Sequence, residues 1–182
     1  MKTIEPGSVN LEQRLRAAIR DIPDFPKKGI IFKDITPVLQ DGKLFREVVD
    51  RFADALKGSG VTHVVGIEAR GFVFGAALAY KLGLSLIPAR KKGKLPHRVI
   101  TESYKLEYGE ATLEIHEDAL RKGDRVVIID DLLATGGTAA ATAKMIERTG
   151  AQIHSILFVV ELNFLNGRMA LKNWNVQSLV AF

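Results

Sequence analysis

Apolar residues recur with helical spacing in the first third of the chain. One face of a first helix is formed by Leu11, Leu15, Ala18 and Ile19, with Asn10 and Gln13 placed as a capping box. A second helix, capped by Asp41 and ending at Gly58, has a core stripe of Leu44, Val48, Phe52, Ala55 and Leu56. Between them, the Pro- and Gly-containing run 22–29 interrupts the chain, and a short strand is expected over residues 30–32.

From residue 63 onward, strand-like and helix-like segments alternate. Strands are predicted over residues 63–67, 84–89, 113–115, 125–129 and 153–160, with a last one within 173–182. Helices are predicted over residues 72–82 and 138–149, and residues 90–110 are expected to form a long loop. The Val/Ile runs are continuous, as in strands buried on both faces. The sequence therefore predicts an α/β fold with a central, mostly parallel twisted sheet and helices on both faces.

Composition and length exclude several classes of protein. The 182 residues suffice for one domain with a substantial core, and 47% hydrophobic residues are ordinary for a globular protein. No apolar stretch approaches the ~20 residues of a membrane span, and residues 1–10 do not resemble a secretory signal, so a cytoplasmic protein without membrane partners is expected. The chain has no cysteine, which excludes disulfides and thiolate chemistry, and its four dispersed histidines do not predict a metal site.

The net charge of +5 is partly local. Five cations lie close together in the sequence, namely Arg90, Lys91, Lys92, Lys94 and Arg98. Such a run fits nucleic acid, an anionic small ligand or a solvated loop. It contains no interleaved aromatic residues, and the chain has no helix-turn-helix or RNP-like motif, so nucleic acid is not an expected partner.

Chemically informative residues follow four of the predicted strands. They form the clusters at residues 68–71, 90–93, 130–138 and 161–162. Because ligands of open parallel sheets bind beyond the carboxyl ends of the strands, the clusters predict one site at one edge of the sheet.

The cluster at residues 130–138 has the pattern of a phosphate site. Gly136 and Gly137 stand between a strand and a helix, where free backbone N–H groups and the helix dipole favour an anion, and Thr135 and Thr138 add hydroxyl donors. Neither the Walker motif nor G-x-G-x-x-G is present. Asp130 and Asp131 suit sugar hydroxyls, since carboxylates accept hydrogen bonds and diols donate them. A phosphorylated ribose fits both the two acids and the glycine-containing loop. The alternative is a turn whose Gly, Thr and Asp serve only for capping.

Residues 126–138, VVIIDDLLATGGT, resemble the phosphoribosyl pyrophosphate signature of the type I phosphoribosyltransferases. Further matches occur in the family's order: DFPxxGIIFKDITP at 24–37, EARGFxFG at 68–75, RKxGKLP at 90–96, YxLEYG at 104–109 and LEIH at 113–116. The chain is most similar to the members that act on adenine. The resemblance implies the type I fold as a single domain over residues 1–182, with about residues 1–37 forming a hood over the base site. It also implies a homodimer that uses Mg²⁺, held mainly by substrate oxygens and water.

The implied reaction transfers phosphoribose from phosphoribosyl pyrophosphate to adenine, giving AMP and pyrophosphate. Asp130 and Asp131 would hold the ribose hydroxyls. The 5′-phosphate would lie against Ala134, Thr135, Gly136, Gly137 and Thr138. Pyrophosphate would meet Ala69 and Arg70, with help from Arg90, Lys91 and Lys94. The adenine pocket would be lined by Ile31, Phe32, Arg70 and Leu162. Glu107 would be the acid/base in a lid over residues 100–109, with Tyr108 beside it contacting substrate.

Several of these residues also have ordinary interpretations. Phe32 and Leu162 fit a hydrophobic core, Arg70 a surface ion pair, and Glu107 a surface carboxylate. Position 69 is Ala where some members carry a hydroxyl or carboxylate, so its role is confined to the backbone, and Lys33 replaces an arginine, which removes a bidentate donor.

Two other functions fit parts of the pattern. A hypoxanthine or guanine transferase would carry an extra Asp in the phosphate loop, where this chain has Ala134, so adenine is favoured. A regulator that only senses phosphoribosyl pyrophosphate would need a nucleic-acid-binding element, and the region before Phe25 offers one helix.

Overall fold

The computed structural model describes residues 10–105 and 110–182. The chain forms two compact units, Met1–Val48 and Val49–Phe182. The described part of the first unit contains helix α1 (Leu11–Ala18), the antiparallel pair β1 (Arg20–Pro23) and β2 (Ile31–Asp34), helix α2 (Thr36–Gln40) and the start of α3 (Gly42–Ala55). In this unit Phe25 and Phe32 pack edge to face, with their ring centroids 5.2 Å apart.

The second unit is built on a seven-stranded sheet in the order β5-β6-β4-β3-β7-β8-β9. Its strands are β3 (His63–Ile67), β4 (Ser85–Lys91), β5 (Val99–Lys105), β6 (Glu110–His116), β7 (Arg125–Leu133), β8 (Gln152–Glu161) and β9 (Val176–Ala181). Strands β4, β3, β7, β8 and β9 are parallel to their neighbours in this order. At one edge β6 pairs antiparallel with both β4 and β5.

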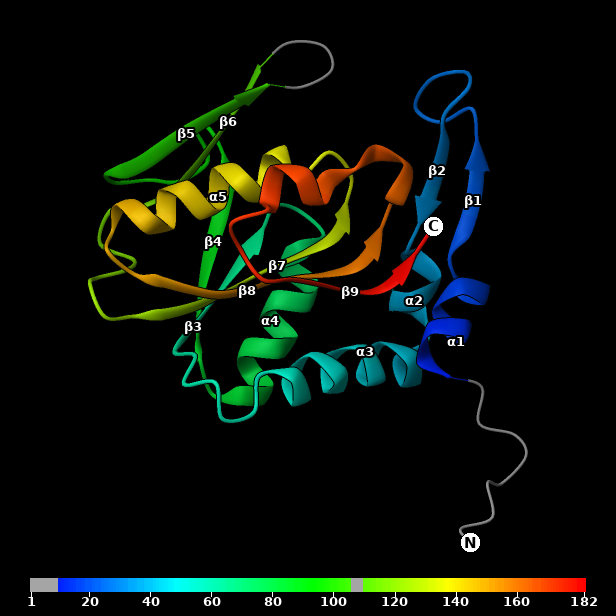
Figure 1. Ribbon diagram of the computed structural model, residues 1–182, viewed down its shortest axis with the longest axis horizontal. Coiled ribbons are helices and arrows are strands. Elements are labelled where there is room, and N and C mark those ends of the chain that lie inside the picture. Colours follow the sequence, from blue (N-terminus) through cyan, green and yellow to red (C-terminus); the bar gives the residue numbers. More distant parts are fainter. Residues whose placement is uncertain (1–9, 106–109) are drawn as a thin grey trace, which may run out of the picture. The chain divides into compact units, whose positions relative to one another are not determined.

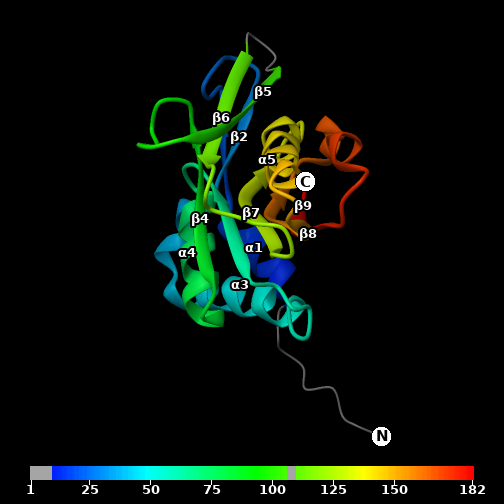
Figure 2. The same cartoon turned by 90° about the vertical axis from the view of Figure 1, so that its left-hand side faces the viewer.

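Helices α4 (Gly71–Leu82) and α5 (Gly137–Arg148) lie on opposite faces of the sheet (Figures 1 and 2). Two short 3₁₀ helices, η1 (Asn163–Leu165) and η2 (Gly167–Leu171), follow β8. On the α5 face, Ala143, Met145 and Ile146 pack with buried Val and Ile residues of β3, β7 and β8. The predicted α/β architecture is therefore confirmed.

Helix ends lie close to where the sequence places them. The Asn10 side chain accepts a hydrogen bond from the N–H of Glu12, and Asp41 accepts from the N–H groups of Lys43 and Leu44 at 2.9 and 3.0 Å. Gly83 adopts the left-handed conformation (φ 65°) that ends α4. No helix among the described residues is long and apolar enough to cross a membrane.

Three expectations about local structure are wrong. Residues 90–110 are not a long loop, because β4 extends to Lys91 and Val99–Lys105 pairs with Glu110–His116 as a hairpin. The strand predicted over 125–129 continues to Leu133, since its ladder with β8 still pairs Asp130 with Phe158 and Leu133 with Glu161. In α3, Ala55 is exposed, and Val49 and Ala53 are buried instead.

Candidate active site

A cavity of about 390 Å³ lies at the carboxyl ends of the central strands. It is lined by Glu68, Ala69, Arg70, Lys91, Tyr104, Leu113, Asp130, Asp131, Leu132 and Thr138. Six of these residues were predicted from the sequence, and they come from four different segments between residues 69 and 138. Three of the four predicted clusters therefore border one cavity, whereas the cluster at residues 161–162 does not.

The two acids at the end of β7 have different surroundings. Asp131 is buried and accepts a hydrogen bond from Arg70 Nε at 2.5 Å, within an ion pair that joins β7 to the segment after β3. Burial and the neighbouring Asp131 carboxylate raise the pKa of Asp130 well above its usual range. The Asp130 carboxylate therefore gains most from a donor or a cation that a ligand brings into the cavity.

A smaller cavity of about 60 Å³ adjoins the first and shares Asp130, Leu132 and Thr138 with it. Its remaining lining residues are Leu133, Ala134, Thr135, Gly136, Ala139 and Phe158. Gly136 is the N-cap of α5 with φ 81°, and no side chain of the described residues caps this helix. The first N–H groups of α5 are thus open to a ligand, as the helix N-terminus of a phosphate site requires.

The loop after β7 is supported from behind by Gly167. A Cβ at Gly167 would lie 2.2 Å from the carbonyl oxygen of Ala134, and one at Gly136 would lie 2.5 Å from the carbonyl oxygen of Gly167. The two backbone segments therefore touch, and only glycine allows this approach.

The position of Gly167 is fixed by the residue that follows it. Arg168 binds Glu161 through Nε and Nη2 at 2.6 and 2.7 Å, and its Nη1 donates to the carbonyl oxygen of Val176. Ser178 also donates to Glu161, at 2.6 Å. Since Glu161 is buried, this bidentate pair anchors η2 to β8 and β9.

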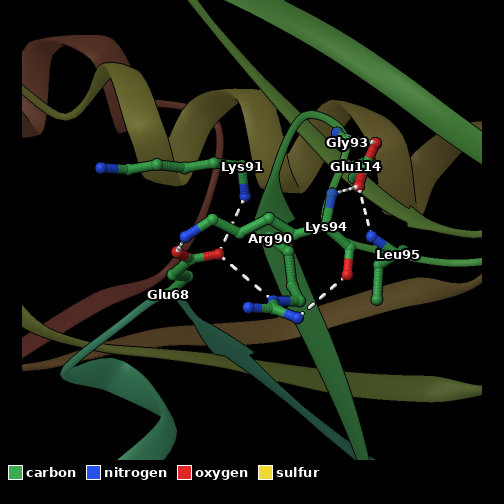
Figure 3. A network of polar contacts seen from close by, with 7 residues as sticks. All are labelled: Glu68, Arg90, Lys91, Gly93, Lys94, Leu95 and Glu114. Atoms are coloured by element: carbon green, nitrogen blue, oxygen red, sulfur yellow. Dashed lines mark hydrogen bonds and ion pairs between the residues drawn. The ribbon is translucent and has the colours of Figure 1, made fainter.

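Glu68 organises the basic end of the large cavity (Figure 3). Its carboxylate accepts hydrogen bonds from Arg90 Nε at 3.3 Å, from the N–H of Lys91 at 3.1 Å, and from Lys94 Nζ. Burial opposes ionisation of Glu68, but these donors outweigh it and lower its pKa. Glu68 therefore stays ionised and holds two of the predicted pyrophosphate-binding cations next to the cavity.

Some predicted site residues lie elsewhere. Arg90 and Lys94 reach the cavity only through Glu68, and Gly137 is the first residue of α5. Leu162 is buried and lines neither cavity; its N–H donates to the carbonyl oxygen of Leu133 at 2.9 Å. Ile31 and Phe32 belong to the first unit. Glu107 and Tyr108 lie outside the described residues.

Sequence reasoning missed two aromatic residues that line the cavities. Tyr104 lies on β5 and packs against the core together with Ile100. Exposure alternates along residues 100–104, with Ile100, Glu102 and Tyr104 on the less exposed side, and this alternation is typical of a strand. Phe158 carries no such signal, because it stands in a continuous apolar run of β8.

Comparisons with known proteins show to which family the chain belongs. The phosphoribosyl transferase domain family matches residues 38–175. An adenine phosphoribosyltransferase of Carboxydothermus hydrogenoformans is 57% identical over 168 residues, which are 92% of this chain and 99% of the relative. The crystal structure of the enzyme of that name from Thermoanaerobacter pseudethanolicus has a TM-score of 0.91 at 53% identity and covers 95% of this chain and 100% of its own.

A structure from Saccharomyces cerevisiae has a TM-score of 0.88 at 39% identity, with 93% of this chain and 98% of that chain covered. It is an adenine phosphoribosyltransferase in complex with an imino-altritol bisphosphate and adenine. The relatives share both the fold and nearly the whole length of the chain. The chain therefore belongs to the phosphoribosyltransferase family and, within it, to the adenine phosphoribosyltransferases.

Proposed function

We propose that this enzyme transfers the 5-phosphoribosyl group from phosphoribosyl pyrophosphate to adenine, giving AMP and pyrophosphate in purine salvage. The proposal rests on the order of three chemical features along one edge of the sheet. An uncapped helix N-terminus adjoins two carboxylates, and these adjoin a cluster of cations. This order matches the 5′-phosphate, the ribose diol and the pyrophosphate of the substrate. The yeast relative, which binds adenine, supports the choice of base.

In the proposed reaction the bond from the sugar carbon to pyrophosphate breaks and a bond to a ring nitrogen of adenine forms. Positive charge develops on the ribose while negative charge develops on the leaving group. Asp130 and Asp131 hold the ribose hydroxyls and face the positive charge on the ribose. Arg70 and Lys91 face the negative charge on the leaving pyrophosphate, with support from Arg90 and Lys94. Charges positioned in advance at both ends are a large source of catalysis.

The remaining contacts follow the family pattern. Ala134, Thr135, Gly136, Gly137 and Thr138 hold the 5′-phosphate. The backbone at Ala69 meets pyrophosphate, with Tyr108 at the substrate.

Mg²⁺ is the proposed cofactor, and it neutralises charge on the diphosphate when bound. Within residues 10–105 and 110–182, no group of three or more His, Cys, Asp or Glu side chains is arranged to hold a metal. Asp130, whose pKa is raised, lines the cavity and gains from a nearby cation. These residues fit an ion bound mainly through substrate oxygens and water, as Mg²⁺ commonly is.

The direct test is formation of AMP from radiolabelled adenine and phosphoribosyl pyrophosphate. We expect guanine, hypoxanthine and xanthine to compete weakly, because the phosphate loop carries Ala134 in place of an acid. Absence of AMP, or preferential use of hypoxanthine or guanine, would contradict the proposal.

Glu107 is the proposed acid/base. A ring nitrogen of adenine changes basicity as the new bond forms, and a carboxyl within reach shares that proton, which typically contributes ~10²–10⁴-fold. Asp130 and Asp131 are assigned to ribose, and Glu68 is bound by three donors. We therefore expect Glu107→Gln to lower kcat more than tenfold and to leave the KM for phosphoribosyl pyrophosphate within a few-fold.

Glu107→Leu is expected to be worse, because Gln retains one hydrogen bond. Single-turnover measurements separate the chemical step from product release. A loss below threefold in both variants would leave Glu107 without a role in proton transfer.

We further propose that the enzyme is a homodimer located in the cytoplasm. Val73 and Tyr80 lie seven residues apart on α4 and are 41% and 92% exposed, so they offer an apolar stripe to a second copy. Sedimentation is expected to give twice the 20.0 kDa chain mass. A fully active monomer at working concentration would refute the dimer.

A further inference from the structure

The basic end of the cavity is shaped by a second buried acid, Glu114. It lies on β6, is 3% exposed, and its backbone pairs with that of Arg90 on β4. Its carboxylate accepts three hydrogen bonds from consecutive N–H groups, those of Gly93 at 3.1 Å, Lys94 at 2.8 Å and Leu95 at 2.7 Å. Figure 3 shows the loop closing around this group.

This arrangement is an anion nest that the protein fills with its own carboxylate. Consecutive N–H groups that converge on one point commonly bind phosphate or another external anion. Here the occupant is Glu114, and Gly93 takes the φ of +82° that the turn needs. Burial opposes ionisation of Glu114, but the three N–H donors lower its pKa, so the group is a carboxylate at neutral pH.

The loop held in this way, residues 92–95, is called the basic loop below. It directs two cations toward Glu68. Lys94 Nζ binds the Glu68 carboxylate, and Arg90, whose Nε also binds Glu68, donates from Nη1 to the carbonyl oxygen of Lys94 at 3.0 Å. Glu68 itself lines the cavity. The three N–H bonds to Glu114 thus determine where the cations stand.

We infer that Glu114 is a positioning residue: by filling the nest of the basic loop it fixes Arg90 and Lys94 where they serve the leaving pyrophosphate. This inference rests on the proposed function, since it assigns the basic end to pyrophosphate. Glu114 does not touch the reacting atoms, and its effect passes through the backbone of residues 93–95.

Electrostatics alone predicts the opposite result from positioning. Glu114→Gln removes a negative charge near the site, which by Coulomb's law favours binding of the pyrophosphate anion. Positioning predicts weaker binding, because Gln has one acceptor oxygen and an NH₂ group that would face an N–H of the loop. The sign of the change therefore separates the two effects.

The experiment measures pyrophosphate and AMP as product inhibitors of the forward reaction. AMP contains the 5′-phosphate, ribose and base but not the diphosphate. We expect Glu114→Gln to raise the inhibition constant of pyrophosphate five- to tenfold and to leave that of AMP within twofold. Glu147→Gln is the matched control, because it removes the same charge from α5 at a residue that accepts a hydrogen bond from Trp174 Nε1 and lines neither cavity. It should leave both constants unchanged.

A second variant keeps the inference testable if Glu114→Gln does not fold. A Cβ at Gly93 would meet no atom within 4 Å, so Gly93→Ala fits sterically and strains only the turn. It should weaken pyrophosphate about threefold without any change of charge. Unchanged or tighter pyrophosphate binding, or equal losses for AMP and pyrophosphate, would overturn the inference. If the wild type forms no AMP, the proposed function fails instead.

Discussion

Replacing Asp130 and Asp131 together with Asn is expected to lower kcat/KM for phosphoribosyl pyrophosphate by at least 100-fold. Both acids line the large cavity, and each would accept a hydrogen bond from a ribose hydroxyl. Hydrogen bonds to charged groups are worth about 1.5–3 kcal/mol each, and every 1.4 kcal/mol corresponds to a factor of ten. Steady-state kinetics at varied phosphoribosyl pyrophosphate measures the loss.

The same variant should not lose stability. A carboxyl whose folded-state pKa is raised contributes stability at low pH that is lost as pH rises through the raised pKa. Burial and Asp131 raise the pKa of Asp130, so ionisation of Asp130 disfavours the folded state. Asn at position 130 removes this penalty, whereas Asn at position 131 weakens the ion pair with Arg70. The two effects oppose each other, and thermal unfolding at pH 7 should occur at an unchanged temperature.

The matched control replaces Asp50 and Asp54 with Asn. These α3 acids form ion pairs with Lys81 and Lys57 away from the site, and the control changes the net charge by the same amount. It should retain wild-type kinetics. Wild-type kcat/KM in the Asp130/Asp131 variant would contradict the assignment of these two acids to the ribose hydroxyls.

Gly167→Ala is expected to weaken binding of the 5′-phosphate ten- to 100-fold. The added Cβ would lie 2.2 Å from the carbonyl oxygen of Ala134 and 2.8 Å from a methyl carbon of Leu133, so one of the two segments must move. The η2 side is anchored by the pair Glu161–Arg168, and the loop after β7 must therefore give way. Forced overpacking costs about 1–3 kcal/mol, within the range that gives this change.

The expected changes in the two inhibition constants are the reverse of those for Glu114→Gln. The inhibition constant of AMP should rise, whereas that of pyrophosphate should change little. Gly42→Ala, where a Cβ meets no atom within 4 Å, is the control and should behave as wild type. Unchanged AMP inhibition in Gly167→Ala would show that the contact between the two backbones does not shape the phosphate pocket.

The parallel core of the fold was predictable because its strands are buried on both faces. The Val/Ile runs at β3 and β7 have no competing interpretation, and Gly83 ends α4 in the conformation that its sequence position indicates. Strand β6 was predicted in part, over residues 113–115, but β5 and its pairing with β6 were missed because the outer positions are polar and the basic run precedes them. A short edge strand with one solvated face resembles a loop when it is judged on hydrophobicity alone.

The site was predictable where it depends on the order of residues along a single loop. Asp130, Asp131 and the glycines that follow them indicate ribose and phosphate by chemistry alone. The partners of the acids on other strands were not predictable in this way. Glu114 and Glu161 are buried carboxylates whose partners are set by pairing between distant strands. Gly167 matters only because it touches Ala134 and Gly136, which lie 33 and 31 residues earlier.

The contact between Gly167 and the loop after β7 also has a consequence for synthesis on the ribosome. A nascent chain gains the strands of the site in the order β3, β4, β7, yet the back wall of the phosphate pocket is translated only with η2. A chain stalled between α5 and η2 would already carry Asp130, Asp131 and the glycine loop, and it would lack the segment that holds Ala134 and Gly136 in place. The binding site therefore becomes complete only after the chain has been made past Gly167.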